Sequence, residues 1–270
     1  MPHKTLIVNR QLLIGIIVAA FFLAGARPLP PAHAATSLET AQSDYNFNYS
    51  KFRDSQERYV NAKNSYLAFK TAASKDQAFA ATKDYLNQVT ALYPTYLGLV
   101  NEYGNSLSWQ DSADVHTNLV KTLAEMSNYF VGQRQQINDT KTLEELSGLG
   151  APMRDKIEKE INPQINFVIA NYEVDDAKDT FATFESLSTQ LGQNKQNFAK
   201  STILANWQTE VDSIKEKAQK SLANAKSRLA DIKDNKATDS DVQAIHIQVT
   251  DEKSQLKKTN PLFMEASRYF

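Results

Sequence analysis

Residues 204–233, LANWQTEVDSIKEKAQKSLANAKSRLADIK, carry the clearest structural signal in the chain. Apolar side chains recur there every three or four residues, which is the spacing of one face of an α-helix. The stripe comprises Leu204, Trp207, Val211, Ile214, Ala218, Leu222, Ala225, Leu229 and Ile232. We expect a helix over residues 194–233, which at ~1.5 Å per residue is about 60 Å long. A helix of this length exceeds the width of a small globular domain.

Comparable stripes precede this segment. Leu38, Tyr45, Phe52, Tyr59 and Tyr66 recur every seven residues, which is typical of a helix that keeps one edge on a partner. Further apolar faces predict helices over residues 79–103, 109–137, 152–162 and 165–191. After the clearest helix, a polar turn at 234–240 and a weaker helix through Val242, Ile245, Val249 and Leu256 are expected.

Caps and breakers predict where these helices begin and end. Ser74 to Gln77 and Thr142 to Glu145 both match the capping box, in which two side chains satisfy backbone N–H groups at a helix start. Pro94 predicts a kink, because proline removes a helical hydrogen bond. Gly148 and Gly150 predict a short helix after Thr142, Pro163 either starts a helix or kinks a long one, and Gly192 predicts a stop.

The expected fold class is all-α, an elongated antiparallel up-down helical bundle with coiled-coil character. Long amphipathic helices joined by short turns hide their apolar stripes by packing side by side. Strand-like blocks are rare, and the chain has no Asn-Gly or Asp-Gly hairpin signal. We expect a signal peptide, or an N-terminal membrane anchor, over residues 1–34, and one helical bundle domain over residues 35–270.

The first 34 residues predict export. Lys4 and Arg10 precede an apolar run at residues 12–26, and Ala32-His33-Ala34 matches the small-x-small end of a secretory signal. The run is shorter than the ~20 residues of a spanning helix. The alternative is an uncleaved anchor formed by residues 12–26. The predicted location is therefore periplasmic, cell-surface or extracellular, with membrane contact only through this segment if it is retained.

Composition excludes several classes of site. The chain has no cysteine, which excludes disulfides and thiolate metal sites. The formal net charge is −1 and becomes more negative if Lys4, Arg10 and Arg27 are removed with a signal. A mildly acidic, mixed surface does not favour phosphate backbones, so we expect no nucleic-acid partner.

The chain carries no recognisable catalytic motif. His116 and His246 are the histidines beyond residue 34, and neither stands in a Glu-x-x-His or His-Glu-x-x-His pattern. Glycine-rich phosphate loops and the Gly-x-Ser-x-Gly elbow are also missing. We therefore expect no catalytic residue, no metal site, no cofactor and no enzymatic activity. A serine, a histidine and a carboxylate brought together in space would support the alternative of an enzyme of unrecognised type.

One candidate interaction stripe remains, formed by Tyr45, Phe52, Tyr59 and Tyr66. Aromatic side chains with a polar tip suit interfaces, whereas the same heptad spacing also suits packing in a core. The signal-like start followed by tyrosine-rich helices at 59–69 and 85–103 resembles uncharacterised exported helical-bundle and coiled-coil proteins of bacteria. That resemblance implies no activity and no functional residue.

The function that these features favour is an exported, non-enzymatic structural or protein-interaction module of the cell envelope or the cell exterior. A protein partner or self-association is expected. The second hypothesis is a membrane-tethered sensor or ligand-binding domain that uses residues 12–26 as its anchor.

Overall fold

The structure, a computed structural model, describes residues 32–109, 112–197 and 202–266, and every element in these ranges is helical. The all-α prediction is thereby confirmed for the described residues. Most of the predicted signal or anchor, residues 1–31, lies outside them. Within the described ranges, none of the helices combines the length and apolarity needed to cross a bilayer.

Tertiary contacts divide the chain into two compact units with a boundary between Ile165 and Asn166. We call the described residues up to 165 the N-terminal unit and those from 166 to 266 the C-terminal unit. The helical domain predicted for residues 35–270 covers both. Each unit has its own packing and is described separately.

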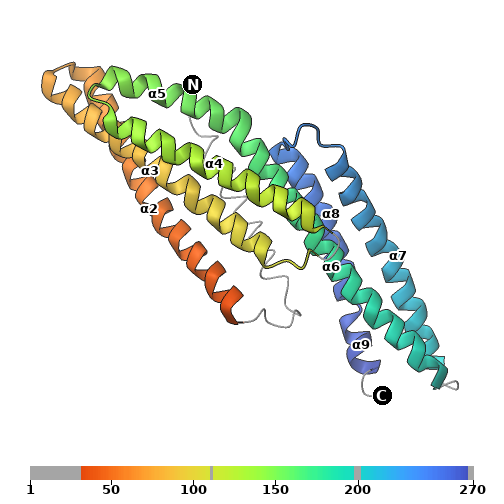
Figure 1. The fold of residues 1–270 in the computed structure, drawn as a ribbon. Coiled ribbons are helices and arrows are strands. Elements are labelled where there is room, and N and C mark those ends of the chain that lie inside the picture. The colour runs from red at the N-terminus through yellow and green to blue at the C-terminus, as the bar shows by residue number, and fades with distance from the viewer. Residues whose placement is uncertain (1–31, 110–111, 198–201, 267–270) are drawn as a thin grey trace. The chain divides into compact units, whose positions relative to one another are not determined.

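The N-terminal unit is organised around α3 (Ala72–Asn105), which packs against α2 (Ala32–Phe69), α4 (Ala113–Asp139) and α5 (Leu143–Lys156) (Figure 1). Alpha-3 can hold this position because it buries residues on more than one face. Besides the predicted stripe, Leu92, Tyr96 and Leu99 are buried. A helix that is apolar around much of its circumference belongs inside a fold.

The starts of α3 and α5 follow capping chemistry, although the predicted start of α3 is displaced. The box at Thr142 and Glu145 is confirmed: the Thr142 hydroxyl accepts from the Glu145 N–H at 3.2 Å, and the Glu145 carboxylate accepts from the Thr142 N–H at 3.1 Å. Helix α3 starts three residues earlier than Ser74 to Gln77 predicts. Thr71 is its N-cap and Ser74 occupies the N3 position. The Ser74 hydroxyl accepts from the Thr71 N–H, so serine takes the role that glutamate or glutamine usually has in a capping box.

The predicted break after Gly148 and Gly150 is wrong. Alpha-5 runs through both glycines to Lys156, a π-helical turn follows at Ile157–Ile161, and α6 (Asn162–Asn197) continues directly. In the π turn, the Asn162 N–H donates to the Ile157 carbonyl. Pro163 offers a reason for the wider turn, since its ring clashes with a carbonyl four residues earlier in an α-helix and it has no N–H to donate.

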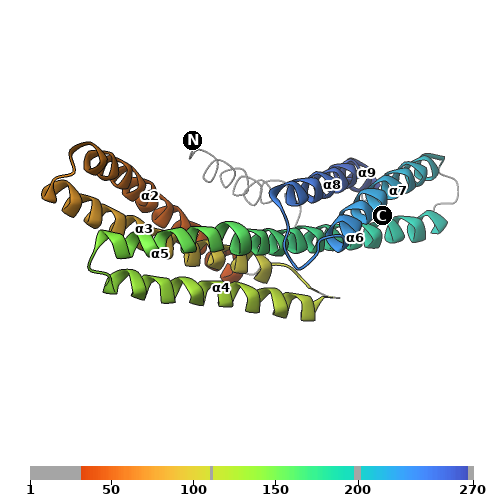
Figure 2. The ribbon, with the colours of Figure 1, turned by 90° about the horizontal axis from the view of Figure 1, so that it is seen from above.

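The C-terminal unit consists of α6 from residue 166 onward, α7 (Thr202–Ala230), α8 (Asp239–Lys257) and α9 (Asn260–Ala266). Figure 2 shows α7 and α8 side by side, and the Ser221–Asp251 and Asn224–Gln248 hydrogen bonds show that these two helices run antiparallel. The stripe that opened the sequence analysis lines this core. Its buried members are Val211, Ile214, Ala218, Leu222 and Ala225.

The boundaries around α7 differ from the prediction. Alpha-6 continues past Gly192 to Asn197, so the described residues 194–197 belong to α6 and not to the next helix. A glycine stops a helix most effectively in the left-handed conformation, and no described glycine has a positive φ. The left-handed turn positions are instead Lys70, Trp109, Asp234 and Asn235. The last two lie in the predicted polar turn, where Asp and Asn tolerate that conformation.

Candidate functional site

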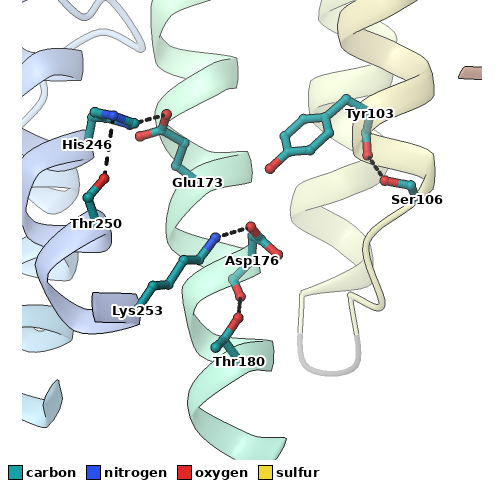
Figure 3. A network of polar contacts seen from close by, with 8 residues as sticks. All are labelled: Tyr103, Ser106, Glu173, Asp176, Thr180, His246, Thr250 and Lys253. Atoms are coloured by element: carbon teal, nitrogen blue, oxygen red, sulfur yellow. Dashed lines mark hydrogen bonds and ion pairs between the residues drawn. The ribbon is translucent and has the colours of Figure 1, made fainter. Parts of the chain in front are cut away.

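Buried ionisable side chains gather on two helices of the C-terminal unit. Glu173, Asp175 and Asp176 lie on α6, and Glu252 lies on α8, each with at most 5% of its surface exposed. Acidic side chains are almost never fully buried without a partner, so their contacts decide what this region does. Figure 3 shows the contacts between α6 and α8.

The first contact joins a hydroxyl, an imidazole and a carboxylate. Nδ1 of His246 lies 3.1 Å from Oε1 of Glu173, and Nε2 of His246 lies 3.4 Å from Oγ1 of Thr250 (Figure 3). The imidazole tautomer with its proton on Nδ1 satisfies both contacts, because Nδ1–H donates to the Glu173 carboxylate and Nε2 accepts from the Thr250 hydroxyl. Thr250 lies one helical turn beyond His246, which places both side chains on the same face of α8.

The second contact is an ion pair one turn farther along α6 and two turns farther along α8. The Lys253 ammonium group binds the Asp176 carboxylate, and both side chains are largely buried. The Thr180 hydroxyl donates to the Asp176 backbone carbonyl at 2.9 Å. Asp175 has a looser neighbour in Lys178, at 3.5 Å. Figure 3 also draws a contact internal to the N-terminal unit, in which the Ser106 hydroxyl donates to the Tyr103 carbonyl at 2.7 Å.

Glu252 has a different environment from these pairs. It is fully buried, and neither of its carboxylate oxygens has a hydrogen-bond partner among the described residues. Burial raises the pKa of Glu252 to about 8, with Lys253 opposing the shift and Asp176 adding to it. A carboxyl group with this pKa is mostly protonated and neutral at pH 7.

A shallow, solvent-open hollow lies beside the imidazole on α8. It is lined by His246, Ile247, Thr250, Asp251 and Ser254. The Asp251 carboxylate is engaged by the Ser221 hydroxyl of α7 at 2.5 Å. Thr250, His246 and Glu173 follow the order hydroxyl, imidazole and carboxylate of a nucleophilic triad. The geometry around them indicates whether they could act as one.

Such a site also needs an electrostatic part, and the described backbone of α8 around Thr250 does not supply it. Acyl transfer needs backbone N–H groups aimed at the developing oxyanion, and this usually contributes the largest share of catalysis. Thr250 lies in the interior of α8, where backbone N–H groups donate to carbonyls of the same helix. Among the described residues, no group of three or more histidine or acidic side chains is arranged to hold a metal ion. The arrangement is suited to holding α6 against α8.

The structure places most of the candidate interaction stripe against α3. Tyr45 is buried beside Tyr96, with ring centroids 5.7 Å apart. Phe52 and Tyr59 both contact the ring of Tyr85, at 5.7 Å and 4.9 Å. Tyr66 is half-buried. Burial raises the pKa of Tyr85 to about 12, as expected for a phenol inside an aromatic cluster.

The two histidines belong to different units and have different neighbours. His116 stacks on Trp109 in the N-terminal unit, with ring centroids 4.7 Å apart and an interplanar angle of 12°. The indole N–H of Trp109 donates to the Gly104 carbonyl at 2.7 Å, which fixes the turn before α4. His246 contacts the Glu173 carboxylate in the C-terminal unit.

Sequence reasoning missed the network on α6 and α8, although one signal for it was present. The buried stripe of α8 steps from Val242 to Ile245 and Val249, and then jumps seven residues to Leu256. The missing position of a three-four pattern is 252, which is a glutamate. No comparable pattern marks Glu173 or Asp176, because the partner of each is more than 70 residues away.

Comparison with known proteins adds no further assignment. No protein family, no curated protein and no solved structure matches this chain.

Proposed function

We propose that this chain is an exported, non-enzymatic helical protein that acts as a protein-interaction module in the cell envelope or outside the cell. The supporting observation is the exposure of α2. Its inner side packs on α3, while Phe47, Val60, Leu67 and Phe69 have between 44% and 71% of their surface exposed. Val60 and Leu67 are seven residues apart and so lie on one side of the helix. Exposed apolar side chains that share one side of a helix, as Val60 and Leu67 do, are typical of protein–protein contact sites.

The proposal includes the finer architecture expected from the sequence, an antiparallel up-down bundle with coiled-coil character. Short connections at residues 70–71 and 140–142 support it, because helices joined by so few residues return alongside each other. The proposed compartment rests on the signal-like residues 1–34. A membrane-tethered sensor is the second candidate, and the apolar run at 12–26 favours it.

Cross-linking from α2 tests the interaction. A photoreactive residue at position 67 should give a discrete adduct with a protein in the native envelope, because Leu67 would lie in the interface. The matched control is position 131 on α4, where Val131 is 63% exposed. An adduct with twice the mass of the chain indicates self-association, and any other protein mass indicates a different partner.

Substitutions on α2 test how much its exposed side chains contribute to the free energy of association. Val60→Ser combined with Leu67→Ser should weaken the association by about 2 kcal/mol, through lost apolar burial, while changing the stability of the monomer by less than ~1 kcal/mol, because both side chains are exposed. Val131→Ser should leave the association unchanged. Equal adducts from positions 67 and 131, or none from α2, would contradict an interface on α2.

A further inference from the structure

Glu252 occupies a position in α8 that the helix pattern assigns to an apolar side chain. Val242, Ile245, Val249 and Leu256 face the core of the C-terminal unit, and Glu252 fills the place between the last two. Its exposed fraction is 0%. The carboxyl group therefore belongs to the packed interior.

The two neighbours of Glu252 along the chain are engaged, whereas Glu252 is not. Asp251 accepts from the Ser221 hydroxyl, and Lys253 binds Asp176. Both carboxylate oxygens of Glu252 are buried without a hydrogen-bond partner among the described residues. A buried ionised carboxylate without partners is strongly unfavourable, whereas the protonated acid is much less so.

The charged side chains on α6 and α8 do not compensate for the cost of ionising Glu252. On α6, the negative charge of Asp176 opposes ionisation of Glu252, and Glu173 is engaged by His246. On α8 itself, the positive charge of Lys253 favours ionisation, but its ammonium group is bound to Asp176. Burial raises the pKa of Tyr172 on α6, so that phenol stays neutral throughout the neutral range.

Among the described residues, the other elements around this core place no balancing charge beside Glu252. The Ser221–Asp251 contact places residues 218–222 of α7 level with Glu252, and the buried residues there are Ala218, Ser221 and Leu222. From α9, Leu262 and Phe263 pack against the same core as partly buried apolar side chains. Protonation is therefore the main means by which Glu252 can be accommodated in the closed unit.

We propose that Glu252 makes the closure of α8 on the C-terminal unit depend on pH, with the helix held when the carboxyl group is protonated and loosened when it ionises. This inference is independent of the proposed interaction function. It concerns only residues of α6, α7, α8 and α9, and it holds whether or not the chain is exported.

The direction of the effect follows from proton linkage. The pKa of Glu252 is about 8 in the folded unit, against an ordinary value of 4.5. Between these two pH values the folded unit retains a proton that the opened state releases, so stability falls as pH rises. The equilibrium constant for opening should increase by about tenfold per pH unit in this window and level off above the folded pKa.

Hydrogen–deuterium exchange of the full chain tests the proposal. The measured quantity is the protection of α8 amides, residues 239–257, between pH 5 and 9, corrected for the intrinsic pH dependence of exchange. In the unmodified protein, protection should fall by up to about tenfold per pH unit below pH 8. In Glu252→Gln, this proton-linked fall should disappear, because the amide does not titrate.

Two further variants keep the test decisive. Imidazoles also change charge in the neutral range, so His246→Gln should retain the steep fall if Glu252 causes it. If Glu252→Gln leaves α8 unprotected at every pH, then Glu252→Leu, which restores the apolar stripe, should give high and flat protection. The same slope in the unmodified protein and in either Glu252 variant would overturn the proposal, as would loss of the slope in His246→Gln alone.

Discussion

At the level of single side chains, the C-terminal unit depends on an ammonium group that is largely buried. Lys253 binds Asp176, and Asp176 has only 5% of its surface exposed. Both charges lose most of their hydration when the unit folds, so each depends on the other. This makes Lys253 a sensitive position even though lysine is usually a surface residue.

Lys253→Met should destabilise the protein by about 3 kcal/mol, because it removes the cation from a buried carboxylate. Adding Asp176→Leu should recover most of that loss, since a buried pair can often be replaced by apolar residues at little cost. Lys215→Met is the control. The side chains of Lys215 and its partner Glu185 are 36% and 46% exposed, so the loss of this pair should cost less than ~1 kcal/mol. Urea unfolding followed by circular dichroism measures the free energy of unfolding of each variant, and equal losses of stability in Lys253→Met and Lys215→Met would contradict a buried Lys253–Asp176 pair.

The candidate site shows why residue-scale prediction from sequence has limits. His246 could be singled out from the sequence, but its carboxylate partner could not, because Glu173 is 73 residues away. Glu252 could have been found from the gap in the α8 stripe. Its lack of a partner depends on which side chains α6 and α7 present, and no local pattern carries that information.

At the level of elements, the helices tolerate more glycine than their sequence suggests. Alpha-4 and α5 run through Gly132 and Gly148, and both glycines are exposed. An added Cβ would meet no atom within 4 Å at either position. Neither glycine has a positive φ, so the backbone conformation suits any residue. These glycines therefore weaken their helices without a packing benefit.

Gly132→Ala and Gly148→Ala should each stabilise the protein, by about 0.5–1 kcal/mol, through a smaller loss of backbone entropy on folding. Thermal unfolding measures the effect. Gly150→Ala is a useful comparison, because its Cβ would lie 3.7 Å from the Leu86 side chain, an ordinary packing contact. Destabilisation by Gly148→Ala would contradict the helical geometry of α5.

The start of α5 was predicted correctly because its signal is local. The capping box at Thr142 involves two side chains three residues apart, and both of its bonds are present. The box at Thr238 and Asp241 has the same chemistry, with Asp in place of Glu, and it starts inside residues 234–240, which were predicted as a turn. Gly192 failed as a stop because it does not adopt the left-handed conformation that ends a helix, and α6 continues through it to Asn197.

At the level of the whole molecule, the N-terminal segment decides between the two proposed modes of action. Cleavage at the Ala32-His33-Ala34 triplet should give a mature chain that begins near Ala35. Retention of residues 12–26 would instead tether the protein, because that run is the most apolar segment before α2.

Intact-mass analysis of the protein from its native host distinguishes these outcomes. We expect the mass of a chain that lacks about 34 residues, because the apolar run is short and is followed by prolines and small residues. Carbonate extraction of the membrane fraction is the companion measurement and should release the protein. A full-length mass together with membrane retention would contradict the released module and favour the tethered sensor.

The sequence alone determined the helical class, because helical periodicity and the scarcity of strand signals are properties of neighbouring residues. It also determined much of the inner face of α7, the start of α5 and the presence of a polar turn before α8. Only the tertiary structure decided that contacts divide into two units, that α3 is central to the first, and that Glu173 meets His246. Those features depend on contacts between residues far apart in the chain, and a linear pattern records which face is apolar but not which helix covers it.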